Sequence, residues 1–211
     1  MSGRDESLLA GSDLVSFAQN VAPDLRQDIL DCLLYAKVTA DARFSSRQAW
    51  RLWLNAYQQA LASTGGLRCA DITDKRLKIH SFKDIRKLPL PVFPGGLALS
   101  PLYIRSIDRL MTSEHAQLFF STWFSSGRSE SFQVMPCAMQ DEHEAVVLSC
   151  ALQMTTLALR PALYFWQIMS GEMHVHAVCT AFRFSRMGYE PFRQRVNERI
   201  AEHAAQEIMR L

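Results

Sequence analysis

Hydrophobic residues in the first third of the chain recur with the period of an α-helix. Ser12 or Asp13 can cap a first helix over residues 13–21, and Pro23 suits the first turn of a second helix. In the second helix the apolar residues at helical spacing are Leu25, Ile29, Cys32, Leu33 and Ala36. Residues 1–11 are small and polar, so we expect a loose terminus before these helices.

A third helix is predicted in SSRQAWRLWLNAYQQALASTGG, residues 45–66. Ser45 or Ser46 can cap it, and the paired glycines can end it. Its apolar face is formed by Trp50, Trp53, Leu54, Tyr57 and Leu61. An apolar stripe at this spacing usually faces inward, so we interpret the aromatic cluster as core and not as a ligand site. Arg47 and Arg51 lie on the other side and are candidates for contact with a partner.

The middle of the chain is first basic and then rich in proline. LRCADI, residues 67–72, can form a short strand, and DKRLKIHSFKDIRK, residues 74–87, holds six Lys or Arg against two Asp. Residues 88–101 contain four prolines and two glycines, which is typical of a loop. We expect an insert over 74–100, whose candidate binding residues are Lys75, Arg76, Lys78 and Lys83. A solvated basic face is the simpler interpretation, and contact with phosphates or acidic lipid is the alternative.

From residue 116 onward the period changes from that of helices to that of strands. Two helices flank this region. Ser100-Pro101 marks the start of the helix before it, and Pro191 suits the first turn of a C-terminal helix that begins at Tyr189. Five strands separated by turns are expected, over 117–124, 131–139, 145–156, 162–169 and 172–184. The predicted fold is a single α+β domain over residues 1–211. Its N-terminal helices and C-terminal helix pack on an antiparallel sheet of about four to five strands in a meander.

His174 and His176 form a His-x-His pair on the last expected strand. Residues two apart on a strand share a face, so both imidazoles could approach one ligand. Two ligands are too few for zinc, which takes three or four, so no metal site is predicted. We interpret the pair as part of the polar face of an amphipathic strand with a core face opposite. No GxxxxGK[ST], GxGxxG or GxSxG motif is present, and no cofactor is expected.

The chain has five cysteines: Cys32, Cys69, Cys137, Cys150 and Cys179. They form no CxxC pair, and the N-terminus lacks the pattern of a secretory signal. We therefore expect a cytoplasmic protein with reduced, mostly buried thiols, or one exported without a cleaved signal. In the alternative interpretation, Cys137, Cys150 or Cys179 lies beside His174 or His176 and acts as a nucleophile or an acyl acceptor.

The charge of the chain is mild. The net charge of +2 and the pI near 8.3 do not indicate a nucleic-acid partner, and none is expected. Of the 23 basic residues 18 are Arg, a residue that favours bidentate contacts and partly buried interfaces. This bias favours a protein partner or self-association.

Two segments of the chain resemble a group of small, largely uncharacterised bacterial and fungal proteins. The early segment is ILDCLLYAKVTADARFSSRQAWRLWLNAYQQALASTGG, with a W-x(2)-W/Y-x(3)-Y core. The late one contains SFQVMPC, a meander and YEPFRQRVNERIAEHAAQEI. The resemblance covers residues ~25–66 and ~116–208, in that order. It implies a shared fold and, for some members, a link with virulence or competition between bacteria, but it transfers no catalytic residue.

These observations favour a non-enzymatic interaction or self-assembling protein, in a virulence- or competition-associated setting. A cysteine-based enzyme or cysteine-acylated protein is the first alternative. The second is a toxin-like effector that binds an acidic membrane surface through residues 74–87.

Overall fold

The computed structural model describes residues 5–10, 13–70, 72–91, 99–113, 129–156 and 173–208. Within these ranges helices and strands both occur, so the predicted α+β class is confirmed. The strands expected over 117–124 and 162–169 lie outside the described residues, as do residues 92–98 of the proline-rich segment.

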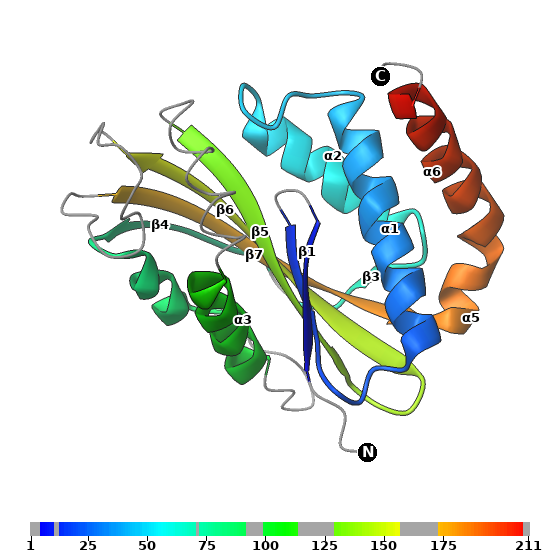
Figure 1. Ribbon diagram of the computed structural model, residues 1–211, viewed down its shortest axis with the longest axis horizontal. Helices are drawn as coiled ribbons and strands as arrows, with labels where there is room; N and C mark the ends of the chain where they lie inside the picture. The colour runs from blue at the N-terminus through cyan, green and yellow to red at the C-terminus, as the bar shows by residue number, and fades with distance from the viewer. Residues whose placement is uncertain are drawn as a thin grey trace. The chain divides into compact units, whose positions relative to one another are not determined.

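Seven strands among the described residues form one mixed sheet in the order β1-β2-β5-β6-β7-β3, and β4 also pairs with β7 (Figure 1). Their bounds are β1 Glu6–Ala10, β2 Asp13–Phe17, β3 Leu67–Arg68, β4 Thr73–Ile79, β5 Ser129–Met139, β6 Glu144–Thr156 and β7 Met173–Ser185. Strands β5, β6 and β7 are neighbours in chain order, as a meander requires. The prediction of four to five antiparallel strands is wrong, because the sheet is larger and β2 pairs with β5 in parallel.

The start of the chain is the main error of the sequence prediction. Residues 13–17 form strand β2 and not a capped helix, and residues 6–10 form β1, which pairs with β2 antiparallel. All five residues of β2 are buried. The apolar residues of this segment, Leu14, Val15 and Phe17, are too few for their spacing to distinguish a buried strand from a helix.

The helices follow the predicted ranges more closely. Their bounds are α1 Pro23–Asp41, α2 Trp50–Ala62, η1 Phe82–Lys87, α3 Ser100–Thr112, α5 Arg186–Tyr189, η3 Glu190–Phe192 and α6 Arg193–Ile208. The predicted cap of α2 is wrong, since the helix begins at Trp50 and Ala49 occupies the capping position without a side-chain hydrogen bond. The Ser45 hydroxyl instead accepts a hydrogen bond of 3.3 Å from the amide of Gln48 in the preceding turn.

The chain divides into two compact units. The first unit comprises residues 1–19, 69–138 and 147–181, and the second comprises residues 20–68, 139–146 and 182–211. In the first unit α3 packs on β2 and η1, and in the second α1 packs on both α2 and α6 (Figure 1). The basic segment predicted as an insert contributes β4 to the sheet.

The aromatic cluster of α2 lies in the core of the second unit, as predicted. Trp50 and Trp53 are each 4% exposed and Tyr57 is fully buried. The rings of Trp53 and Tyr57 stack with their centroids 5.2 Å apart. The indole N–H of Trp53 donates a 2.6 Å hydrogen bond to Asp41, so its polar atom is satisfied at the edge of the cluster.

None of the helices in the described part of the chain is both long enough and apolar enough to cross a lipid bilayer.

Candidate functional site

The register of β4 on β7 gathers four basic side chains on one face of the first unit. The two strands are antiparallel, with Arg76 opposite His176 and Lys78 opposite His174. Directly opposite residues of an antiparallel pair project from the same face, and residues two apart on a strand do so too. Arg76, Lys78, His174 and His176 therefore share one face, which we call the basic face.

Strand β6, on the other side of β7, adds two polar side chains to this arrangement. Cys150 of β6 and Cys179 of β7 are bonded to each other, so they lie on the same side of the sheet. Alternation from these cysteines places Gln153 and Thr155 on the side opposite to them, which is also the side of the basic face. Gln153 and Thr155 are half-buried and alternate with the buried Leu152 and Met154, which agrees with this assignment.

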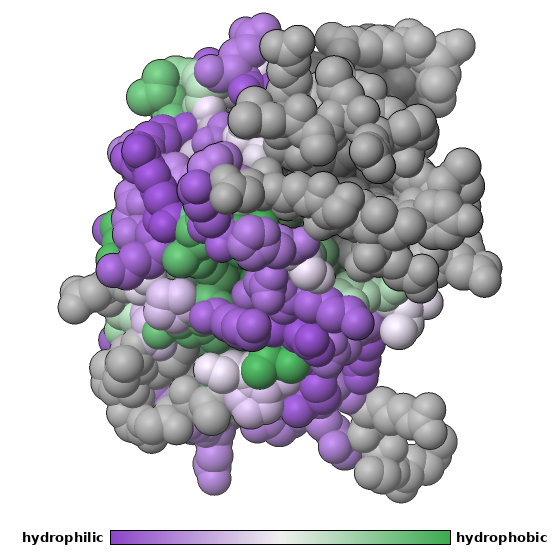
Figure 2. All heavy atoms as spheres, turned by 90° about the vertical axis from the view of Figure 1, so that its left-hand side faces the viewer, coloured by the Kyte–Doolittle hydropathy of each residue, from purple (hydrophilic) through white to green (hydrophobic). Residues whose placement is uncertain are grey.

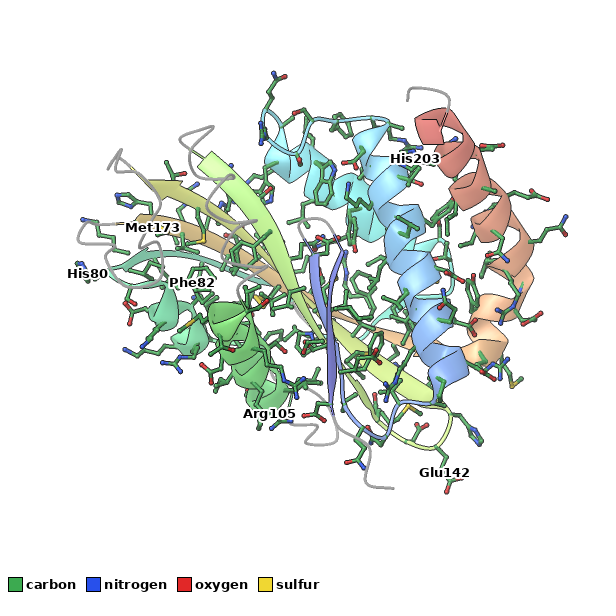
Figure 3. The ribbon with its side chains drawn as sticks, viewed as in Figure 1. His80, Phe82, Arg105, Glu142, Met173 and His203 are labelled. Carbon is green, nitrogen blue, oxygen red and sulfur yellow. A yellow bond between two sulfur atoms is a disulfide. The ribbon has the colours of Figure 1, made fainter. Side chains whose placement is uncertain are left out.

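A pocket of about 230 Å³ lies on the basic face. Its lining residues are Arg76, Leu77, Lys78, Gln153, Thr155, His174, Val175 and His176. Every polar side chain of this lining carries a hydrogen-bond donor in at least one of its states, and two of them carry fixed positive charges. The pocket can thus supply several donors to one acceptor-rich group. The pocket lies near the end of the β4–β7 pair that is marked in Figure 3 by the labelled residues Met173 and His80.

Asp74 fixes one of the imidazoles. Its Oδ1 lies 2.6 Å from Nε2 of His176, whose side chain is only 13% exposed. A hydrogen bond at Nε2 fixes the orientation of the ring. Asp74 also cancels part of the positive charge on this strand, yet Arg76 and Lys78 keep the balance positive when both imidazoles are neutral.

Like charges lie close together on the basic face. Residues two apart on a strand are about 7 Å apart, and directly opposite ones about 5 Å. Two unit charges 7 Å apart repel by roughly 0.6 kcal/mol in water and by more beside a protein surface. Hydrophilic residues dominate the described surface on the side of the molecule where β4 and η1 lie, with small apolar patches between them (Figure 2). A negatively charged ligand would relieve this repulsion.

The remaining predicted binding residues lie elsewhere. Lys75 is exposed on β4, but it is opposite Ala177 and projects from the other face of the strand. Lys83 is exposed on η1, where its amide donates to the Ser81 hydroxyl. Arg47 and Arg51 are exposed residues of the second unit. The structure therefore brings together Arg76, Lys78, His174 and His176 and not the other four.

The sequence interpretation missed Asp74, Gln153 and Thr155 as members of the site. The alternation of β6 contained a signal for Gln153 and Thr155, because they interrupt an apolar run with period two. Their position beside His174 and His176 depends on strand order, which the chain alone did not provide.

The cysteines do not assemble with the histidines. Cys150 and Cys179 form a disulfide with Cα atoms 4.2 Å apart, so the expectation of reduced thiols is wrong for this pair. Cys179 has the opposite parity to His174 and His176 on β7 and so projects from the other face. Cys137 is fully buried, and burial raises the pKa of the Cys32 thiol to about 12. Burial and a raised pKa are both opposite to what a nucleophilic thiol needs.

A second polar cluster lies in the second unit and holds α1 to α6. The guanidinium of Arg193 donates to both carboxylate oxygens of Asp28, at 2.6 and 3.0 Å, and stacks over the Tyr189 ring at 4.7 Å. The hydrogen bond to Asp28 is the main cause of the raised pKa of Arg193, and burial raises the pKa of the Tyr189 hydroxyl. Asp28 is 4% exposed, so this cluster is closed to a ligand and stabilises the packing.

Across the described ranges no group of three or more His, Cys, Asp or Glu side chains is placed to hold a metal ion.

Comparison with known proteins gives a likeness of fold only. No family model matches the chain, and a search of curated proteins finds no match. Among solved structures, the Evf virulence factor aligns at 10% identity and a TM-score of 0.44, over 92% of this chain and 82% of that one. Activated Cyt2Ba monomer from Bacillus thuringiensis subsp. israelensis aligns at 10% identity and a TM-score of 0.47, over 80% of this chain and 94% of that one. A delta-endotoxin aligns at 12% identity and a TM-score of 0.40, over 83% of each chain. At these identities and scores the likeness carries no argument about function.

Proposed function

We propose that this protein is a non-enzymatic interaction protein that binds an anionic partner through the basic face. The observation that carries the proposal is the register of β4 on β7, which sets Arg76 against His176 and Lys78 against His174. The proposed partner is another protein or a second copy of this chain that presents an anionic group to this face. The virulence- or competition-associated setting is part of the proposal and rests on the resemblance described above.

The position of β4 favours recognition over a purely protective role. Among the described strands β4 pairs with β7 alone, and Lys at such an edge often serves only to prevent pairing with another sheet. In this protein Arg76 and Lys78 line a pocket together with side chains from β7 and β6. A concave group of converging donors is typical of a binding site, whereas protection of an edge needs only single exposed charges.

Fluorescence anisotropy with a fluorescein-labelled oligoglutamate peptide tests the proposal. We expect saturable binding that weakens steeply with salt, because exposed charges are screened within about 10 Å at 0.1 M. The variant R76Q/K78Q should bind the peptide at least about tenfold more weakly than the unmodified protein. Light scattering of both proteins, with and without peptide, would show whether the same face joins copies of the chain. Equal binding by the two proteins, or none by either, would contradict the proposal.

A membrane-surface-binding, toxin-like effector is the second candidate function. It is supported by the exposed cations that continue from β4 into η1, where the Lys87 side chain is 82% exposed. Each Lys or Arg near an anionic surface contributes about 1 kcal/mol. Co-sedimentation with phosphatidylcholine vesicles containing phosphatidylserine tests it, against vesicles of phosphatidylcholine alone. Neutralising Lys75, Arg76, Lys78 and Lys83 should abolish the difference, and unchanged co-sedimentation would remove this candidate.

A further inference from the structure

We propose that the pocket on the basic face is a specific site for a phosphate monoester group. The inference rests on the proposed function, because it gives the chemical class of anion that the basic face recognises. It goes beyond a general attraction between charges, since it assigns the binding to one pocket and to six polar side chains.

The donor set of the pocket fits a tetrahedral oxyanion. Arg76 and Lys78 carry up to eight N–H donors between them, and the imidazoles, the Gln153 amide and the Thr155 hydroxyl add more. A phosphate monoester offers three terminal oxygens and a charge of about −1.5 to −2 at neutral pH. A carboxylate offers two oxygens in one plane, so it can accept hydrogen bonds from fewer of these converging donors.

The size of the pocket fits a group and not a whole ligand. Sites for drug-sized molecules measure about 300–1,000 Å³, whereas this pocket measures about 230 Å³. The four basic side chains start from the corners of a rectangle of about 5 by 7 Å, so all of them can reach one small anion. The ester oxygen and the rest of the ligand would extend away from the lining.

The charges around the pocket favour an anion. Arg76 and Lys78 come from β4 and His174 and His176 from β7, whereas the lining residues of β6 are uncharged. Asp74 lies on the same face of β4, but its carboxylate is bound to Nε2 of His176. This contact orients His176, and among the described residues of this face the fixed positive charges of Arg76 and Lys78 outnumber the negative charge of Asp74, so the face attracts an anion.

Strand β4 provides a matched control for the experiment. Lys75 lies between Asp74 and Arg76 on the same strand, carries the same charge and is exposed, but it projects from the opposite face. A binding mode that depends only on the charge of β4 would respond equally to K75Q, R76Q and K78Q. A binding mode that depends on the pocket would respond to R76Q and K78Q but not to K75Q.

Isothermal titration calorimetry with inorganic phosphate at low salt tests the pocket. We expect saturable one-to-one binding that weakens at least about tenfold in R76Q and in K78Q and at most about twofold in K75Q. The imidazole resonances of His174 and His176 should shift on titration, a local readout that loss of folding would not mimic. An equal effect of all three substitutions overturns the inference.

Vesicles identify the source of the phosphate group. Phosphatidic acid carries a phosphate monoester, whereas phosphatidylserine carries a diester and a carboxylate. Binding to phosphatidic acid vesicles that requires Arg76 and Lys78 supports the inference with a lipid headgroup as ligand. Binding of inorganic phosphate without any preference for phosphatidic acid supports it with a soluble phosphate.

The oligoglutamate titration separates this inference from the proposed function. If the peptide binds and neither phosphate nor phosphatidic acid does, the inference fails and the proposed function stands. If neither the peptide nor any phosphate probe binds, both fail.

Discussion

Asp28 on α1 is a buried carboxylate whose two oxygens both accept hydrogen bonds from Arg193 on α6. Its side chain is 5% exposed and that of Arg193 is 30% exposed. Breaking a buried pair costs about 3–5 kcal/mol, and partial access of Arg193 to water lowers this to about 2–3 kcal/mol. We expect D28N to lower the free energy of unfolding by this amount, measured by urea denaturation followed by circular dichroism.

D24N is the matched control on the same helix. Asp24 pairs with Arg186 at 3.0 Å, but its side chain is 69% exposed, and such surface pairs contribute about 0–1 kcal/mol. Equal losses in D24N and D28N would show that burial does not determine the contribution of these carboxylates.

Cys32 should be inert although it is a free thiol. It is fully buried, its Sγ lies 3.8 Å from the carbonyl oxygen of Thr64, and burial raises its pKa to about 12. Thiolates are the reactive species, so at pH 8 the native protein should leave Cys32 unlabelled by iodoacetamide, whereas the half-buried Cys69 is labelled faster. Peptide mass spectrometry at several times measures both rates. Labelling of Cys32 as fast as that of Cys69 would refute its burial.

At the scale of elements, Asp84 connects the end of β4 to η1. Its carboxylate accepts hydrogen bonds from Lys87 at 3.1 Å and from the amides of Ser81 and His80, at 3.1 and 3.3 Å. These bonds lower its pKa, with the bond from Lys87 as the largest cause. A carboxylate with a lowered pKa stabilises the fold above the ordinary carboxyl pKa of about 3.9, and this contribution disappears as the pH falls through the folded value.

The variant D84N should therefore lose stability only where the carboxylate is ionised. We expect a loss of about 0.5–1 kcal/mol at pH 7, since the group is partly exposed, and almost none well below pH 3.9. Urea midpoints of both proteins over this pH range measure the difference. A difference that stays constant with pH would mean that the charge of Asp84 is not its source.

Gly65 ends the turn after α2 in a conformation that other residues avoid. Its φ is +93°, and a Cβ at this position would lie 2.5 Å from the carbonyl oxygen of Gly188. We expect G65A to lower the free energy of unfolding by about 2 kcal/mol or more. G188A is the control, because its Cβ would meet only the Ser185 hydroxyl at 3.1 Å and the Gly65 carbonyl oxygen at 3.7 Å. Thermal denaturation of both variants measures these losses. Equal losses of stability in G65A and G188A would contradict the argument.

The amphipathic helix α2 was predictable from the sequence, and the short buried strand β2 was not. The stripe of Trp53 and Tyr57 identified α2, because a helix at the surface of a core keeps a polar side. Strand β2 has no polar side, since even Asp13 and Ser16 are buried. Its polar atoms are satisfied by contacts across strands, such as the 3.4 Å contact between Gln133 and Asp13, which only the fold provides.

At the scale of the whole molecule, strand order was the missing information. The sequence identified the four residues of the basic face separately, in a basic segment and in a His-x-His pair. Their assembly required β4 to pair with β7. In this pair Ile79 is opposite Met173, although 93 residues lie between these two positions in the chain. No short-range pattern determines such a pairing. The disulfide was missed for another reason, because the expectation of reduced thiols came from the absence of a CxxC pair and of a secretory signal pattern.

The disulfide gives a test of the whole fold. It closes a loop with a sequence separation of 29 residues, and loop closure of this length stabilises a fold by about 3–4 kcal/mol through the unfolded chain. For a chain of this size that corresponds to a decrease of roughly 10 °C in Tm when the bond is absent. We expect this decrease in Tm when the protein is unfolded and refolded in the presence of a phosphine reductant. Thermal melts followed by circular dichroism measure it. Under denaturing conditions without reductant, alkylation should add labels only to Cys32, Cys69 and Cys137.

The double variant C150A/C179A is the control for that experiment. Both cysteines are almost completely buried, at 0% and 1% exposed, so small apolar side chains suit their positions. The variant should melt below the oxidised protein, and reductant should leave its Tm unchanged because no bond remains to break. Alkylation of all five cysteines in the unreduced protein, together with a Tm that ignores reductant, would show that β6 and β7 are held by hydrogen bonds and packing alone.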